Sequence, residues 1–464
     1  MTAAGPSQHT AATGSESVRP LPILRDMPAA TPSGRRLGGA VLAYLVTVTL
    51  LITWAPFDFA ARPQHGLTSL WTWSDLLLNV LMFVPLGFLW QAATREARGE
   101  PRVATGTHRA VLPAFLVGAL LSGIIETGQL FLADRFTSLL DVLSNAVGAM
   151  LGAWALRRLQ SRLQVTSGTV RALALDLPLS GVIVLLLPLL WTWSVGDDGP
   201  ARTPLLWMAA YTGGVLIGSV HGSYLSTSSR ARDASVAATA WLLVGAMPTV
   251  LRSPSHEVLL HSLGAALLAA LVSGWRSDRA ARQRRIDGTQ RVEYRALRLA
   301  MPTFAVYLTL CALWPLTAID GLWRAAWMLA PAATALSRGL LLSSLAHLAA
   351  FTVVGYVTAE FHGRDNQRFV ASWPRVVRTV VPLAILLEWA RGWNATIGAS
   401  GIVFALAVAS GLFGGWLYHL QRDHVRALRE RSVTGAVDGS AIGAGGRAFE
   451  RDPFDVPLAV KSPA

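Results

Sequence analysis

Seven polar residues in the first third of the chain have the types needed to exchange protons with a substrate or to bind a polar ligand. Three are carboxylates, three are amides and one is an arginine: Asp75, Asn79, Glu126, Gln129, Arg135, Asp141 and Asn145. Carboxylates can act as general acids or bases, and an arginine can hold an anionic group through two parallel hydrogen bonds. No nucleophile stands beside an evident base here, so we predict a functional, ligand-binding polar cluster without a catalytic residue.

The spacing of these residues pairs them on helix faces. Residues three or four positions apart share one face of a helix, and three such pairs occur: Asp75 with Asn79, Glu126 with Gln129, and Asp141 with Asn145. Arg135 follows the second pair in a short turn, where we expect it to neutralise Glu126 or Asp141. Two interpretations stay open: a binding site, or an ion-paired clasp between two helices.

Apolar segments surround this cluster and indicate a membrane protein. Of 464 residues, 52% are hydrophobic and 14% are charged, whereas soluble domains carry about 25% charged residues. The apolar residues form blocks of roughly 18 to 22, enough for a helix to cross about 30 Å of hydrocarbon. Backbone groups in hydrocarbon must pair internally, and the blocks lack the alternation of a β-barrel. The sequence therefore predicts an all-α, polytopic membrane protein.

The apolar blocks predict about 12 transmembrane helices. We place them at roughly 37–56, 75–92, 111–132, 137–156, 174–194, 203–222, 236–251, 256–275, 299–318, 340–360, 376–391 and 398–419. Residues 322–335 are also apolar, but Arg324 and Pro331 favour an interfacial helix there.

Charge predicts the orientation of these helices. Alternate segments, counted from the N-terminus, hold 33 of the 40 basic residues, and the other side holds seven. Under the positive-inside rule, both termini are then cytoplasmic. Arginine supplies 39 of the 40 basic residues, which suggests a GC-rich bacterial genome. We therefore predict a multi-pass protein of the bacterial cytoplasmic (inner) membrane.

A four-helix unit recurs along the chain, over residues 37–160, 174–280 and 299–420. The acid, polar residue and glycine that begin the fourth helix recur in the second unit, at Glu257, His261 and Gly264. In the third unit His347 has the spacing of Asn79, and Glu388 takes the place of Glu126. We interpret units two and three as degenerate copies, although apolar helices can also resemble one another by chance.

The chain ends differ from the helical units. Residues 1–36 and 421–464 are rich in small and polar residues, a composition that cannot bury enough apolar surface to fold alone. We predict a disordered cytoplasmic leader and a disordered cytoplasmic tail.

The sequence gives little indication of other partners or of cofactors. The net charge of +13 comes from arginines in short loops, which indicates contact with inner-leaflet lipid and no nucleic acid. The single cysteine, Cys311, excludes a cysteine-based zinc site. His256 and His261 are five positions apart and do not share a helix face, so we predict no metal site and no cofactor.

Trp191 and Trp193 suit an outer aromatic belt.

The polar residues also resemble the signature of a known family. The patterns Asn79-x3-Phe83-x-Pro85-Leu86-Gly87 and Glu126-x2-Gln129-x5-Arg135-x5-Asp141-x3-Asn145-x2-Gly148 are similar to the VanZ-like family, as is Pro56-Phe57-Asp58. The resemblance covers about residues 40–157. It implies an integral membrane domain, linked to teicoplanin-type glycopeptide resistance in the name-giving member and without an established biochemical activity in most members.

Three functions stay open. The leading hypothesis is a non-enzymatic envelope protein that recognises a lipid-linked cell-wall component or a lipoglycopeptide at the outer leaflet, where all seven polar residues are expected. A secondary transporter of a small or amphiphilic solute would suit parallel repeats, but it calls for ionisable residues near the midplane. An intramembrane enzyme acting on a lipid headgroup would need a catalytic set that this sequence lacks. The expected partners are the lipid bilayer and such a lipid-linked ligand.

Overall fold

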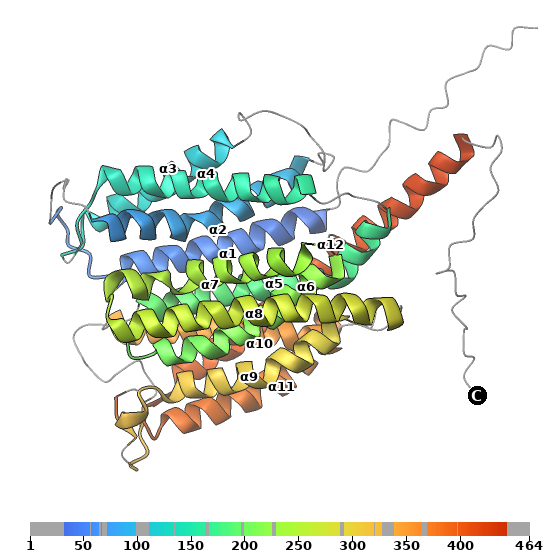
Figure 1. The fold of residues 1–464 in the computed structure, drawn as a ribbon. Coiled ribbons are helices and arrows are strands. Elements are labelled where there is room, and N and C mark those ends of the chain that lie inside the picture. Colours follow the sequence, from blue (N-terminus) through green and yellow to red (C-terminus); the bar gives the residue numbers. More distant parts are fainter. Residues whose placement is uncertain are drawn as a thin grey trace, which may run out of the picture.

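The chain folds into a bundle of helices that run side by side (Figure 1). This computed structural model describes residues 32–55, 57–64, 66, 72–98, 111–133, 135–162, 167–195, 199–224, 229–287, 292–319, 321–326, 338–362, 369–396 and 398–442. Within these ranges there are twelve α-helices and one short pair of parallel strands. The prediction of an all-α, polytopic membrane protein is confirmed.

The helices follow one another in three sets of four. The first set is α1 (Pro32–Trp54), α2 (Trp73–Arg98), α3 (Leu112–Gln129) and α4 (Leu139–Arg162). The second is α5 (Ser167–Val195), α6 (Leu206–Tyr224), α7 (Arg230–Arg252) and α8 (His256–Asp287). The third is α9 (Val292–Leu313), α10 (Arg338–His362), α11 (Phe369–Arg391) and α12 (Gly401–Ile442). The strands are β1 (Ala325–Ala326) and β2 (Ala399–Ser400).

Ten of the described helices are long and apolar enough to cross a membrane, and the apolar helical segments of α1 and α5 are shorter. Several helices extend beyond their predicted spans. α7 begins at Arg230 and α11 at Phe369, well before the predicted starts near residues 236 and 376. Backbone hydrogen bonding continues through polar residues, whereas the sequence pattern marks only the apolar block.

The start predicted for the first helix and the end predicted for the last helix also need correction. α1 begins at Pro32, inside the predicted leader, and α12 continues to Ile442, through half of the predicted tail. The rest of the leader and tail lies outside the described residues.

The segment predicted as an interfacial helix is extended where the structure describes it. β1 pairs in parallel with β2, in register Ala325 with Ala399. The Arg324 backbone N–H donates to the Gly392 carbonyl, and its carbonyl accepts from the Ala399 N–H. These pairings with the chain after α11 replace helical ones, so the helix prediction is wrong for 322–326. Residues 327–335 lie outside the described ranges.

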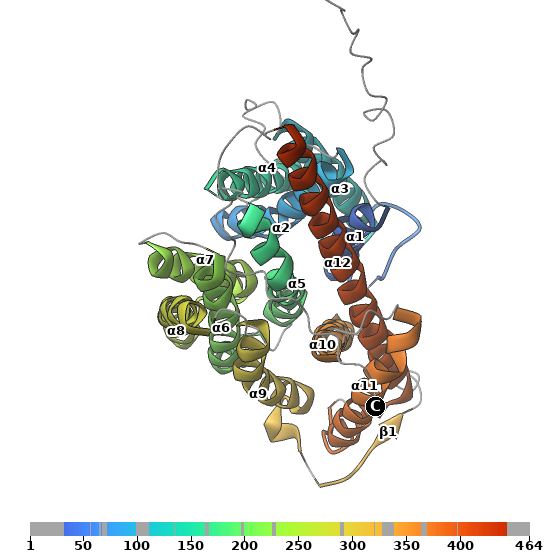
Figure 2. The same ribbon diagram turned by 90° about the vertical axis from the view of Figure 1, so that its right-hand side faces the viewer.

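Seen along the helix axes, the sets occupy different sectors of the bundle (Figure 2). α1–α4 form one group and α6–α8 a second, α9 lies against α6, and α10–α12 pack on one another, with α5 lying between the groups. α5 packs against helices of all three sets, including α7, α10 and α1. It therefore forms part of the wall of any cavity between the groups.

Glycines bring the second and fourth helices of the first and third sets into close contact. A Cβ atom on Gly87 of α2 would overlap the Ala149 carbonyl of α4, and one on Gly355 of α10 would overlap the Gly411 carbonyl of α12. A methyl group at either place would force the helices apart. Small residues allow this backbone approach in membrane helices.

The prediction of an outer aromatic belt is wrong for Trp191 and Trp193. Both side chains are buried, at 2% and 7% exposure. Trp191 Nε1 donates to the Val244 carbonyl at 3.0 Å, and the Trp193 ring stacks on Tyr307 with centroids 5.0 Å apart. These tryptophans face protein because α5 is surrounded by other helices.

Candidate functional site

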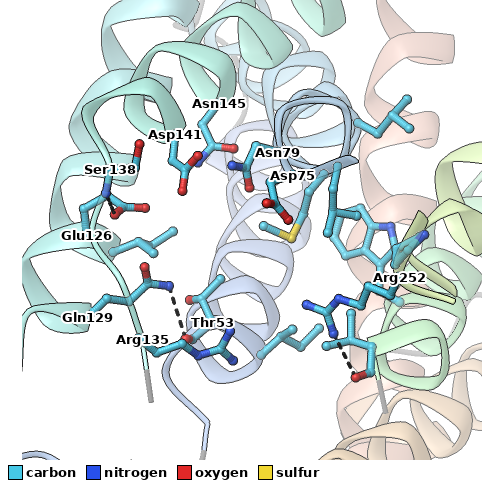
Figure 3. Close-up of a pocket in the computed structure, with 18 of the residues that line it drawn as sticks. Thr53, Asp75, Asn79, Glu126, Gln129, Arg135, Ser138, Asp141, Asn145 and Arg252 are labelled. Atoms are coloured by element: carbon cyan, nitrogen blue, oxygen red, sulfur yellow. Dashed lines mark hydrogen bonds between the residues drawn. The ribbon is translucent and has the colours of Figure 1, made fainter. Parts of the chain in front are cut away.

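A cavity of about 580 Å³ lies where the starts of α2 and α4 meet the ends of α1, α3, α5 and α7. All seven polar residues singled out from the sequence line it: Asp75, Asn79, Glu126, Gln129, Arg135, Asp141 and Asn145. Figure 3 shows their side chains turned toward a common space. The fold thus brings the three helix-end pairs and the arginine together, while their role stays a prediction.

The second set of helices contributes residues that the sequence reasoning missed. Arg252, from the end of α7, and Trp191, from α5, line the same cavity. Arg252 Nη1 donates to the Val195 carbonyl at the end of α5, at 3.1 Å. One available signal was that Arg252 is among the few basic residues on the predicted outer side. Only packing between the sets reveals that it joins this site.

Asp75 also shapes the start of α2. Its backbone N–H donates to Thr72 Oγ1 at 3.2 Å, and Thr72 Oγ1 donates to Asp75 Oδ2 at 2.6 Å. Such bonds satisfy the unpaired groups at a helix N-terminus. Asp75 therefore stabilises the helix end that carries it into the cavity.

Glu126 joins the end of α3 to the start of α4. Its Oε2 accepts a hydrogen bond from the Ser138 backbone N–H at 2.9 Å, and its own carbonyl accepts one from Thr137 Oγ1 at 3.2 Å. The unpaired N–H groups of a helix N-terminus attract a carboxylate in this position. The end of α3 and the start of α4 are therefore joined by a hydrogen bond between a side chain and the backbone. No described hydrogen bond engages Oε1, the second oxygen.

Asp141 and Asn145 present further acceptors from the first turns of α4. Asp141 lies beside the Asn79 side chain and close enough to Asp75 for their charges to repel. Asn145 Nδ2 donates to Ser122 Oγ at 2.8 Å. Asn145 Oδ1 is buried without a hydrogen-bond partner among the described residues. An unsatisfied buried acceptor costs about 1–3 kcal/mol, so this atom marks a place for a donor.

The two arginines lie across the cavity from Asp141 and Asn145 (Figure 3). Gln129 lies on their side, and its Nε2 donates to the Thr53 carbonyl at 3.4 Å. The site therefore has an acceptor-rich region and a cationic region, which we call the acceptor end (Asn79, Glu126, Asp141 and Asn145) and the arginine end (Arg135 and Arg252).

The predicted ion pair of Arg135 is not formed. Ion pairs among the described residues join Arg232 to Asp233 and Arg391 to Glu388. None of them joins Arg135 to Glu126 or Asp141. The prediction was wrong because the turn after α3 directs Arg135 to the far side of the cavity.

The third set contains a counterpart of Glu126. Glu388 Oε2 accepts from the Ser400 backbone N–H at 2.9 Å, as Glu126 Oε2 does from Ser138. Arg391 Nη1 donates to Glu388 Oε1 at 2.7 Å, and His347 Nε2 lies 3.3 Å from the same oxygen. All three side chains are buried, so the charge of Glu388 is neutralised inside the protein.

The third set differs from the first at every other acceptor. Counted from the glutamate, Val403 stands where Asp141 would be, Ala407 replaces Asn145, and Arg391 replaces Gln129. The cavity beside His347 and Arg391 has a volume of about 20 Å³, which is little more than one water. The Arg391 guanidinium is bound to Glu388, at the position that Gln129 has in the first set.

The other candidate ligands have ordinary contacts. His261 Nδ1 accepts a hydrogen bond from Trp207 Nε1 at 3.1 Å. In the described part of the chain, no cluster of three or more His, Cys, Asp or Glu residues could hold a metal ion.

Comparison with known proteins identifies the segment that carries the cavity's acidic residues. Residues 36–160 match the family model described as VanZ/LLP1. Curated proteins and solved structures give no match for any part of the chain. The VanZ-like resemblance is confirmed for α1–α4, which supply all seven predicted residues.

Proposed function

We propose that this VanZ-like membrane protein binds the polar headgroup of an amphiphile in the cavity between α1–α4 and α7. The ligand class we favour is a lipid-linked cell-wall component or a lipoglycopeptide. One observation carries the proposal: Asn145 lines a cavity of about 580 Å³, and its Oδ1 is a buried acceptor without a hydrogen-bond partner among the described residues. Small-ligand sites typically measure about 300–1,000 Å³ and place a few polar groups in an otherwise apolar wall.

The proposal includes the orientation of the protein. The cavity lies at the ends of the helices opposite to the ends of the bundle where α1 begins and α12 finishes (Figure 1). The excess of basic residues on the terminal side supports a cytoplasmic location for both termini. The cavity then faces the outer leaflet of the cytoplasmic membrane, where an amphiphile could enter it laterally.

The composition of the wall favours binding over catalysis. Among the described residues that line the cavity there is no histidine, lysine or cysteine. Its acidic groups already serve local structure: Asp75 with Thr72, and Glu126 with Ser138. Covalent catalysis would need a nucleophile with a positioned base.

Binding can be tested on the purified full chain in nanodiscs made from bacterial lipid extract, with native mass spectrometry as readout. Wild-type protein should retain an amphiphile adduct, or take up added teicoplanin as the probe for lipoglycopeptides. Asn145→Leu should lose that adduct, whereas Leu143→Ala, on the exposed face of α4, should keep it. Equal retention by wild type and Asn145→Leu would overturn the proposal.

The proposal that the ligand is a lipoglycopeptide, and that the protein affects resistance to it, has a separate test. Deleting the gene should change susceptibility to teicoplanin, and complementation with Glu126→Gln or Arg135→Ala should not restore it. Unchanged susceptibility after deletion removes the lipoglycopeptide as ligand and leaves a lipid-linked ligand.

A further inference from the structure

Comparison of the first and third sets of helices indicates which charges the ligand carries. We infer that the cavity takes a zwitterionic group, with a primary ammonium at the acceptor end and a phosphate or carboxylate at the arginine end. The inference rests on the proposed function and narrows its ligand to a chemical class. Such a group can come from an aminophospholipid or from the end of an amino acid or peptide.

Glu388 shows what this glutamate position binds when it is filled. Its Oε2 is held by the Ser400 N–H, and Oε1 is held by the Arg391 guanidinium at 2.7 Å. Glu126 keeps the first contact, with Ser138, but has Gln129 in place of the arginine. Gln129 turns to the Thr53 carbonyl instead. The first set thus preserves the anionic receptor and lacks the internal cation.

The first set also adds acceptors around the same place. Asp141 and Asn145 occupy positions where the third set has Val403 and Ala407. A primary ammonium has three N–H donors. Glu126 Oε1, Asp141 and Asn145 Oδ1 could accept one each, and the last of these lacks any described protein donor. A carboxylate-bearing wall of this kind also disfavours a purely anionic headgroup.

The arginine end would bind the negatively charged group of the ligand. Arg135 and Arg252 approach the cavity from different sets of helices, on the side away from Asp141 and Asn145 (Figure 3). Guanidinium groups bind phosphate and carboxylate oxygens through paired N–H donors. The separation of acceptors and arginines across one cavity therefore matches a ligand whose opposite charges are joined by a short linker.

The decisive variant reproduces the glutamate–arginine pair of the third set of helices in the first set. Gln129→Arg should place a guanidinium beside Glu126, as Arg391 lies beside Glu388, and should exclude the ammonium. It removes no acidic residue, so its melting temperature should match or exceed that of wild type. The matched control is Thr127→Arg, which adds the same side chain on the exposed face of α3.

The probes separate charge pattern from lipid character. Titration of the purified full chain would use dihexanoyl-phosphatidylethanolamine, dihexanoyl-phosphatidylglycerol, which lacks the ammonium, and the dipeptide alanyl-alanine, which lacks acyl chains. We expect phosphatidylethanolamine to bind at least about tenfold more tightly than phosphatidylglycerol, the discrimination typical of charge-assisted hydrogen bonds. Gln129→Arg should remove this preference and Thr127→Arg should keep it.

Each outcome decides the inference. Tight binding of phosphatidylethanolamine alone assigns the site to an aminophospholipid, and comparable binding of alanyl-alanine assigns it to a free zwitterion. Equal affinity for phosphatidylethanolamine and phosphatidylglycerol, or an unchanged preference in Gln129→Arg, overturns it. If both lipids bind equally and Asn145→Leu lowers the affinity for both, the inference of a zwitterionic ligand is wrong. The proposed headgroup-binding site then stands. If no probe binds wild type, the zwitterionic ligand is wrong, and retention of an amphiphile from bacterial lipid extract decides the proposed function separately.

Discussion

Glu126 and Glu388 make the same contact: each accepts a hydrogen bond at 2.9 Å from the backbone N–H of a serine 12 positions later, Ser138 or Ser400. In both places the bond fastens the end of one helix to the start of the next. The two sites then diverge, because Glu388 is neutralised by Arg391 whereas Glu126 faces a cavity. A shared framework thus supports one closed site and one open site.

The hydrogen bond of Glu126 predicts a difference between two substitutions. Glu126→Gln should unfold near the wild-type temperature because the amide oxygen can still accept the Ser138 N–H. Glu126→Leu should lower the free energy of unfolding by about 1–3 kcal/mol, since that N–H would stay buried without a partner. Thermal unfolding followed by intrinsic fluorescence would measure both. Equal melting temperatures for the two variants would contradict this account of α3 and α4.

The ion pair in the third set predicts a larger loss. Arg391→Leu leaves the buried Glu388 carboxylate without its guanidinium and should cost about 3–5 kcal/mol. The double variant Glu388→Leu with Arg391→Leu should be less destabilised than Arg391→Leu alone, because no buried charge is then left over. A double-mutant cycle on melting temperature gives the comparison. Simple additivity of the two substitutions would show that they are not coupled.

Glycine packing predicts which helices tolerate a methyl group. A Cβ at Gly152 would overlap the Val84 carbonyl, so Gly152→Ala should destabilise the protein by at least about 1–3 kcal/mol. Gly123→Ala is the control, because nothing lies within 4 Å of a Cβ there. Size-exclusion recovery and melting temperature should fall only for Gly152→Ala. A similar fall for Gly123→Ala would show that close helix packing is not the cause.

The proposed orientation predicts the side from which residues can be labelled. In a Cys311→Ser background, Pro63→Cys should react with a membrane-impermeant maleimide added to intact cells, and Arg232→Cys should react only after lysis. Both positions are exposed in the structure. The reverse pattern would place the cavity on the cytoplasmic side.

Much of the first set could be predicted from sequence because its signals are local. The four-residue spacing of Asp75 with Asn79, and of Asp141 with Asn145, follows from helix geometry alone. The same pattern predicted that the helix ends lie on one side of the bundle. Glu388 could be matched to Glu126 because the preceding helix repeats the spacing of Asn79, Phe83 and Gly87 at His347, Phe351 and Gly355.

The remaining features depend on packing between sets. Trp191 and Arg252 reach the cavity because α5 and α7 pack beside α1–α4, and no local pattern encodes that. Arg135 sits in a turn whose conformation decides which side it faces, so its expected ion pair was wrong. The start of α7 was misplaced because its first turn is polar, and the start of α11 because Pro374 and Arg375 interrupt the apolar run after Phe369.

The claim that the cavity admits an amphiphile is tested most directly by ligand protection of a cysteine in its wall. Thr53→Cys, in the Cys311→Ser background, should react with an impermeant maleimide, and added dihexanoyl-phosphatidylethanolamine or bacterial lipid extract should slow that reaction. Pro63→Cys, in the exposed loop outside the cavity, should react at the same rate with and without lipid. Failure of Thr53→Cys to react, or an equal rate in the presence of every lipid, would contradict the account.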